Sequence, residues 1–210
     1  MTPKPRKESI EETRAKLIAA ARHAFATKGY ADASMDEFTA EVGLTRGALY
    51  HHFGDKKGLL GAVIAQIDAE MSSRLRAISE GAKTTWDGFI DENVAYIRMA
   101  LEPEIQRIML LDGPAVLGNP SVWPNQNACI RSTRHSIETL IAEGMIRQVD
   151  AEATARLLNG AVLSASLWIA GAENPEATSR QAIDAFIAVA SGLLRDRPRE
   201  PGTQTARKRR

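Results

Sequence analysis

The chain has 210 residues, of which 44% are hydrophobic and 25% charged, with a formal net charge of +1. This balance is ordinary for a globular protein. The single cysteine excludes an intramolecular disulfide framework and a multi-cysteine zinc site. No uncharged run of about 18 apolar residues is present, so no transmembrane helix is expected. The basic N-terminus is followed by no hydrophobic signal core, which favours a cytoplasmic location.

The small net charge conceals an uneven distribution. Residues 1–60 carry 10 Lys/Arg against 8 Asp/Glu, residues 61–197 carry 12 against 17, and residues 198–210 carry 5 against 1. An acidic body with basic ends argues against nucleic-acid binding over the whole surface. It allows a localised footprint near the N-terminal end.

Helical periodicity runs through most of the chain. Apolar residues recurring at three- and four-residue spacing predict helices over residues 10–28, 34–43, 45–52, 55–78, 84–102, 105–111, 125–143, 150–171 and 175–195. The stretch from 112 to 124 holds two glycines and three prolines and is expected to be mostly loop. No sustained period-two alternation occurs, so the fold class is predicted to be all-α, with about nine helices.

These patterns divide the chain into four parts. Residues 1–8 are predicted to be a disordered basic arm, and residues 198–210 a disordered basic tail. Residues 9–55 are expected to form a small three-helix domain. Residues 56–197 are expected to form an antiparallel helical body.

Residues 34–53 are typical of a helix-turn-helix. Ser34 and Glu37 have the spacing of a capping box, and Gly43 suits a turn that needs a positive φ angle. Inward packing that would set the angle between the two short helices is expected for Phe38, Val42, Leu44 and Leu49.

The outward face of the second short helix suits DNA. Thr45, at the helix N-terminus, suits a phosphate contact, and Arg46 has the fork that matches guanine O6 and N7. Gly47 would let the backbone approach the groove closely. Lys56, in the first turn of the next helix, would hold a backbone phosphate. The remaining DNA-binding candidates are Ser34, Tyr50 and His51.

The segment from Glu41 to Leu60, Glu-Val-Gly-Leu-Thr-Arg-Gly-Ala-Leu-Tyr-His-His-Phe-Gly-Asp-Lys-Lys-Gly-Leu-Leu, resembles the signature of TetR-family transcriptional regulators. The preceding helix fits as well through Ala21, Phe25, Gly29 and Tyr30. The close resemblance covers about residues 10–62. It implies a three-helix DNA-binding domain, a helical ligand-binding and dimerisation body, and repression relieved by a small molecule.

Two positions depart from the family pattern. Phe38-Thr39 stands where the family usually has Ile-Ala, so a bulkier polar residue occupies a position that is normally small. Ser34 stands where Thr is common, which preserves the hydroxyl. The first departure predicts an altered packing angle between the helices of the motif.

The body is expected to bind an effector and to form a homodimer on a pseudo-palindromic DNA operator. Aromatic and methionine side chains with few charges favour a lipophilic or aromatic effector. The predicted effector pocket comprises Trp86, Phe89, Met99, Met109, Asp112, Trp123, Asn127, His135 and Trp168. The predicted dimer interface, on the last two helices, comprises Leu158, Val162, Ala165, Ile183, Phe186, Ala190 and Leu194.

Two other functions are compatible with parts of the sequence. An architectural DNA-binding protein without an effector is the main alternative, and it would bind DNA without sequence preference. Catalytic activity is a weaker alternative. Asp112 and His135 could form an acid–base pair, but the sequence indicates no nucleophile and no phosphate-binding loop. No cofactor or metal is expected, since His51 and His52 point about 100° apart on a helix.

Overall fold

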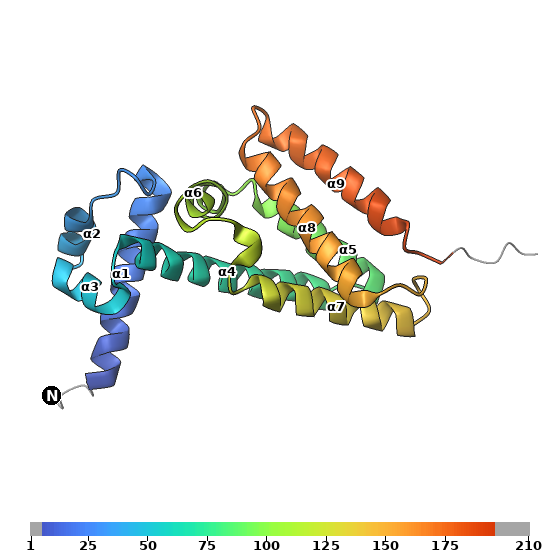
Figure 1. Cartoon of the computed structure of the whole chain (residues 1–210), viewed down its shortest axis with the longest axis horizontal. Coiled ribbons are helices and arrows are strands. Elements are labelled where there is room, and N and C mark those ends of the chain that lie inside the picture. Colours follow the sequence, from blue (N-terminus) through green and yellow to red (C-terminus); the bar gives the residue numbers. More distant parts are fainter. Residues whose placement is uncertain (1–5, 196–210) are drawn as a thin grey trace, which may run out of the picture.

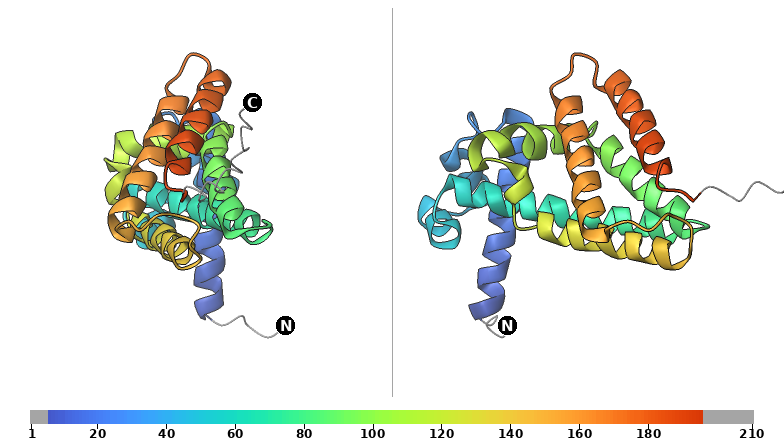
Figure 2. Two further views of the ribbon diagram at one scale, coloured as in Figure 1. Left: turned by 90° about the vertical axis from the view of Figure 1, so that its right-hand side faces the viewer. Right: turned by 45° about the vertical axis from the view of Figure 1, so that its right-hand side comes forward.

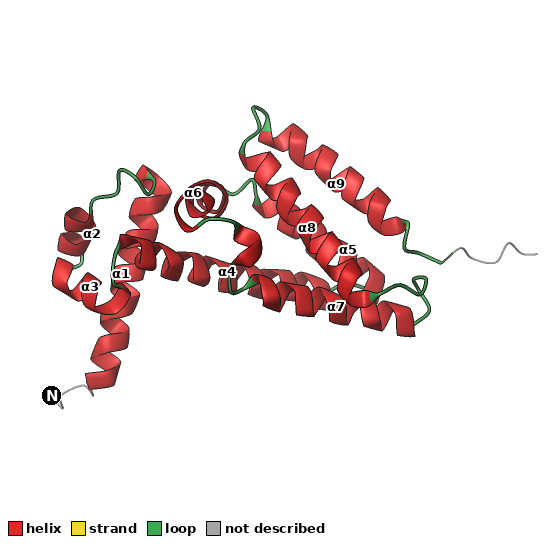
Figure 3. Ribbon diagram, viewed as in Figure 1, coloured by secondary structure: helices red, strands yellow, loops and turns green. Residues whose placement is uncertain are grey.

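The computed structural model describes residues 6–195, and within them the fold is all-α with one isolated antiparallel bridge between Ile146 and Leu194 (Figures 1 and 3). In chain order the elements are α1 (Arg6–Lys28), α2 (Met35–Glu41), α3 (Arg46–Phe53), α4 (Lys56–Glu80), α5 (Thr85–Met99), the π-helix η1 (Ile105–Asp112), α6 (Gly113–Leu117), the 3₁₀-helix η2 (Pro120–Val122), α7 (Gln126–Ala142), α8 (Ala151–Ala170) and α9 (Pro175–Ser191). The predicted class is confirmed.

Local capping sets the helix starts that the sequence predicts. The Ser34 hydroxyl accepts from the Glu37 amide at 3.5 Å, and Thr45 caps α3 by accepting from the Ala48 amide at 3.3 Å. Only half of the predicted capping box forms, because the Glu37 carboxylate pairs with Lys28 of α1 rather than with the cap. The prediction is therefore wrong for the Glu37 side chain, whose carboxylate joins α2 to α1 through the ion pair with Lys28.

Several boundaries differ from the sequence prediction, among them the end of α5, which is Met99 instead of residue 102. Helix α1 already includes residues 6–8 of the expected arm, while residues 1–5 and the predicted tail lie outside the described residues. The expected loop over 112–124 contains α6 and η2, because Pro114 and Pro120 each sit in a first helical turn, where no amide donor is needed. Helix α9 ends at Ser191, four residues before the predicted end.

The first three helices share a small aromatic core. Phe25, Phe38 and Leu49 are fully or almost fully buried, and the rings of Phe25 and Phe38 meet edge-on at 6.2 Å. Thr39 is also buried, and its hydroxyl donates to the Met35 carbonyl at 2.7 Å. The polar residue in the normally small position is therefore satisfied within its own helix.

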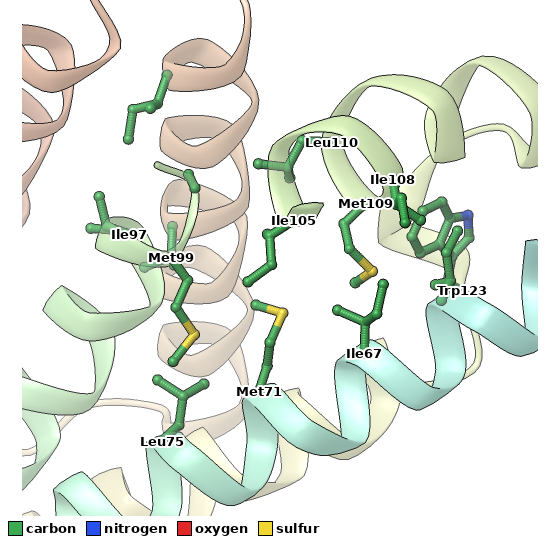
Figure 4. Close-up of a cluster of buried hydrophobic side chains, with 14 of the residues drawn as sticks. Ile67, Met71, Leu75, Ile97, Met99, Ile105, Ile108, Met109, Leu110 and Trp123 are labelled. Atoms are coloured by element: carbon green, nitrogen blue, oxygen red, sulfur yellow. The ribbon is translucent and has the colours of Figure 1, made fainter. Parts of the chain in front are cut away.

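Helix α4 joins this unit to the body and spans much of the molecule (Figures 1 and 2). One face of α4 carries Met71 and Leu75, which point toward Ile105 and Met109 of η1 and Met99 of α5 (Figure 4). Helices α8 and α9 lie side by side at the end of the molecule opposite α2 and α3. The body core thus connects α4 directly to η1.

Polar contacts fasten η1 to the N-terminal unit. The Asp112 carboxylate accepts from the Tyr30 backbone amide at 2.8 Å and from Arg107 Nε at 3.2 Å. Just before η1, the Glu104 carboxylate takes two hydrogen bonds from Arg22 of α1, both at 2.7 Å. Any displacement of η1 therefore pulls on α1.

Candidate functional site

The outer surface of α3 forms the first part of the site. Thr45, Arg46, Gly47 and His51 are exposed, and the Tyr50 side chain is 49% exposed although it is a large aromatic residue. Gly43 has a φ of +66°, which makes the turn between α2 and α3 with no side-chain strain. The turn leaves this hydrogen-bonding face free of packing.

Arg46 is already engaged in the absence of a partner molecule. Its Nε lies 3.0 Å from the Asp36 carboxylate of α2, and both side chains are more than half exposed. An exposed ion pair of this kind is weak, about 0–1 kcal/mol. Asp36 therefore orients the guanidinium along the α3 face at little cost, and the pair can open when a better acceptor arrives.

Gly47 has free space where a side chain would project. A Cβ placed there would meet only the Thr45 hydroxyl, at an ordinary 3.6 Å. The protein's own packing does not require glycine at this position. The missing side chain leaves the backbone of α3 exposed at this point.

Lys56 is less available than its position suggests. Its Nζ lies 4.6 Å from the centre of the Tyr30 ring and donates to the Ala31 carbonyl at 3.4 Å. Burial lowers the pKa of its ammonium group. The adjacent Lys57 is exposed. Of the two lysines, the predicted phosphate ligand Lys56 is therefore the one that already contacts other residues of the chain.

A cavity of about 360 Å³ between α4, α5, α7 and α8 forms the second part of the site. This volume is at the small end of the roughly 300–1,000 Å³ range of ligand pockets. Its apolar wall includes Phe89 and Val162. Its polar wall holds Asp68, Glu92, Tyr96, Cys129, Ser132, Thr133 and Asn159.

The ionisable groups of the cavity influence one another. Burial raises the pKa of Asp68 and of Glu92, and it raises the pKa of the Tyr96 hydroxyl further above its usual value. Burial, with Asp68 and Glu92 nearby, raises the pKa of the Cys129 thiol to about 11. The cavity thus holds two carboxylates whose charged form is disfavoured by burial, beside the neutral Tyr96 hydroxyl and Cys129 thiol.

Most predicted pocket residues lie elsewhere. Phe89 lines the cavity, and Met109 and Trp123 line a small neighbouring hollow that also touches Asp68 and Tyr96. Neither space is lined by the other six predicted pocket residues, which are Trp86, Met99, Asp112, Asn127, His135 and Trp168.

Each of these six residues has another environment. Trp86 packs on the Phe89 ring at 5.9 Å, Met99 is buried in the core, and Asp112 binds the Tyr30 amide. Asn127, His135 and Trp168 are exposed. The lining is also more polar than expected.

Asp68, Glu92 and Tyr96 line the cavity but are absent from the pocket predicted from the sequence. One signal was available, because Asp68 interrupts the apolar stripe of α4 between Ile64, Ile67 and Met71, all of which are buried. A charge in a buried stripe is unusual unless it is paired or functional. Glu92 and Tyr96 share a helix face at i and i+4, which sequence spacing also shows.

The predicted dimer residues mostly face the core of the chain itself. Leu158, Val162, Ile183, Phe186 and Ala190 are buried within it, and Ala165 and Leu194 are half-buried. On α8 the exposed stripe is the neighbouring one, with Leu157 at 74% and Trp168 at 55% exposed. Both helices are apolar on wide faces, so periodicity could not tell which face the monomer covers.

Two further properties concern the described residues alone. Over residues 6–195, no helix is long and apolar enough to cross a membrane. No group of three or more His, Cys, Asp or Glu side chains in the same range could hold a metal ion.

Comparison with known proteins matches both halves of the chain. The family model for bacterial regulatory proteins of the tetR family matches residues 17–63, and the model for a tetracyclin repressor-like C-terminal domain matches residues 86–193. A solved TetR-family transcriptional regulator from Pectobacterium atrosepticum is 50% identical, with a TM-score of 0.85 over 92% of this chain and 99% of that chain.

More distant relatives agree with these matches. The transposon Tn10 TetC protein of Escherichia coli is 29% identical over 73% of this chain and 78% of its own length. The solved complex of RolR with resorcinol is 18% identical and matches 91% of this chain and 99% of that chain, with a TM-score of 0.64. The last likeness concerns the fold alone.

Proposed function

Because this chain belongs to the TetR family of DNA-binding transcriptional regulators, we propose that it is a cytoplasmic homodimeric repressor released from its operator by a small molecule. The exposed hydrogen-bonding face of α3 is the observation that carries the proposal. The Tyr50 ring is exposed to solvent and Arg46 is held only by a weak exposed ion pair with Asp36, and both side chains suit a major groove.

The contacts divide into two kinds. Thr45, at the N-terminus of α3, together with Ser34 and an α4 lysine, holds phosphates and sets the register on DNA. Arg46, Tyr50 and His51 read base edges, and Gly47 allows the helix to lie close to them. Arg46 exchanges Asp36 for guanine, an acceptor pair that matches its fork.

The uncovered faces of α8 and α9 support a homodimer. On α8, Leu157, Ala161 and Trp168 recur at helical spacing and are exposed, and on α9 Val189 is 67% exposed. An apolar stripe of this kind, continuous along a helix, is typical of a protein interface. Two-fold pairing there places two copies of α3 on one side of a duplex, which requires a pseudo-palindromic operator.

Release requires that the cavity and α3 be coupled. Asp68 and Met71 line the cavity from α4, and only two residues separate the end of α3 from the start of this helix. The second connection runs through η1, which contacts α4 in the core and holds Tyr30 through Asp112. A ligand that displaces α4 against η1 therefore changes the position of α3.

The test begins with selection of binding sites from a random duplex library, followed by titration of the selected site at several salt concentrations. We expect a pseudo-palindromic site bound at least about 10³-fold more tightly than random DNA. Arg46→Ala should relax one base position in each half-site at a cost of about 1–3 kcal/mol. Arg98→Ala, which removes an exposed arginine of α5, is the matched control and should leave the site unchanged.

The rival architectural function predicts a different result. Affinity would then follow salt alone and no sequence motif would emerge from the selection. Coupling supplies a second criterion, because operator binding and effector binding must weaken each other by the same factor. An effector whose affinity is unchanged by saturating operator would contradict the release mechanism.

A further inference from the structure

Asp68 is a carboxylate in the cavity wall that lacks a cation. Within residues 6–195 it forms no ion pair, and the Asn125 amide is the side chain that stabilises it by hydrogen bonding. Glu70, two residues further along α4, does have a cationic partner, because its carboxylate accepts a hydrogen bond from Arg22 Nη1 at 2.7 Å. Taking a charge partly out of water without a counter-ion is unfavourable, and burial accordingly raises the pKa of the half-buried Asp68 carboxyl.

The other charges that face the cavity do not neutralise it. On α4, Arg76 and Glu80 lie on the exposed part of the lining, and on α5 the Glu92 carboxylate interacts with Ser79 and Arg76. No Lys, Arg or His of α7 or α8 belongs to the lining. The charge of Arg76 lowers the pKa of Glu92, and Asp68 has no such compensating cation.

The surroundings of Asp68 suit a cation with an apolar body. Tyr96 lies beside it, and its hydroxyl forms no hydrogen bond with any residue of the described part of the chain. An aromatic ring next to a carboxylate stabilises a positive charge through both its π-face and the anion. Phe89 and Val162 continue the wall with apolar surface.

We propose that the effector of this protein is a small organic cation, in which a protonated amine is joined to an apolar or aromatic body. The inference rests on the proposed function and names the chemistry of its effector. The ammonium group pairs with Asp68 beside Tyr96, and the body lies against Phe89 and Val162. Glu92 contributes less to binding of the ammonium group, because the charge of Arg76 already acts on its carboxylate. A metal ion is a poorer occupant, because the described residues hold no three-ligand group.

The experiment compares ligands that differ only in charge. 2-Phenylethylammonium, 3-phenylpropylammonium and 4-phenylbutylammonium are each titrated into the full-length protein beside the alcohol and the carboxylate of the same skeleton. Calorimetry reports binding, and the intrinsic tryptophan fluorescence, to which Trp123 of the neighbouring hollow contributes, is a second readout. We expect an ammonium member to bind at least tenfold more tightly than its alcohol, and its carboxylate not to bind measurably.

Three variants identify the carboxylate responsible. Asp68→Asn keeps the shape of the side chain and should weaken ammonium binding at least tenfold, while Glu92→Gln should weaken it less. Asp91→Asn is the matched control, because Asp91 is exposed on α5 and outside the lining. Circular dichroism and operator affinity establish that each variant is folded.

The proposal is overturned by any of three results. These are equal binding of the alcohol or carboxylate, undiminished ammonium binding by Asp68→Asn, or no binding by any of the three ammonium ions at millimolar concentration. Operator binding without ligand is measured on the same samples. If it is specific, only the effector class fails; if no specific operator exists, the proposed function fails instead.

Discussion

The clamp between α1 and the start of η1 makes a quantitative prediction. Arg22 donates to both oxygens of Glu104 and to Glu70, all at 2.7 Å, and its side chain is only 22% exposed. Hydrogen bonding to Glu104 and then to Glu70 raises the pKa of the guanidinium above its already high value. This clamp ties α1 of the N-terminal unit both to α4, through Glu70, and to the residue that precedes η1.

The magnitude follows from geometry and exposure. Exposed ion pairs contribute about 0–1 kcal/mol, and breaking a fully buried pair costs about 3–5 kcal/mol. Glu104 is 34% exposed and Glu70 is 47% exposed, so solvent screening moves the clamp toward the lower range. The bidentate geometry strengthens the Glu104 arm, which gives an expected Arg22–Glu104 coupling of about 1–2 kcal/mol.

Urea unfolding of Arg22→Met, Glu104→Gln and the double variant measures this coupling as a double-mutant cycle. The exposed pair Arg156 and Glu152, at i and i+4 on α8 with an N–O distance of 2.7 Å, is the matched control, expected near 0.3–0.5 kcal/mol. A coupling for Arg22 and Glu104 no larger than the control would refute the argument that the clamp joins the two units.

Three further predictions concern the two parts of the site. Gly47→Ala should keep or raise stability, by up to about 1 kcal/mol from helix propensity, because the new methyl group has space; gel-shift titration should nevertheless show operator affinity reduced about tenfold or more. Cys129 should react slowly with iodoacetamide at pH 8, because a pKa of about 11 against 9.0 leaves about a hundredfold less thiolate; reaction at the rate of a free thiol would contradict the buried site. Asp68→Asn should raise the Tm of the ligand-free protein at pH 7, by about 2–4 °C for roughly 1 kcal/mol. Its folded-state pKa is raised, so the cost of its charge appears as the pH rises above 3.8, and the Tm difference should shrink as the pH is lowered toward that value. A Tm difference independent of pH would show that packing, and not charge, is responsible.

Local chemistry made the DNA-binding unit readable from sequence. The hydroxyls of Ser34 and Thr45 and the carboxylate of Asp55 cap helices through bonds to amides three residues away. Such contacts depend on neighbours along the chain, so spacing is enough to find them. The same holds for the exposed face of α3, which a single helix of eight residues displays.

For the body, residues 56–195, the sequence predicted the helices but not how they pack against one another. Periodicity shows that a face of α8 is apolar, but the residues that cover it come from α7 and α9, and this places Leu158 inside and Leu157 outside. The same reason separates Asp112, which binds the Tyr30 amide 82 residues away, from Asp68, which lines a cavity. A side chain's role in the body is set by which distant helix lies against it, and that depends on the packing of the whole chain.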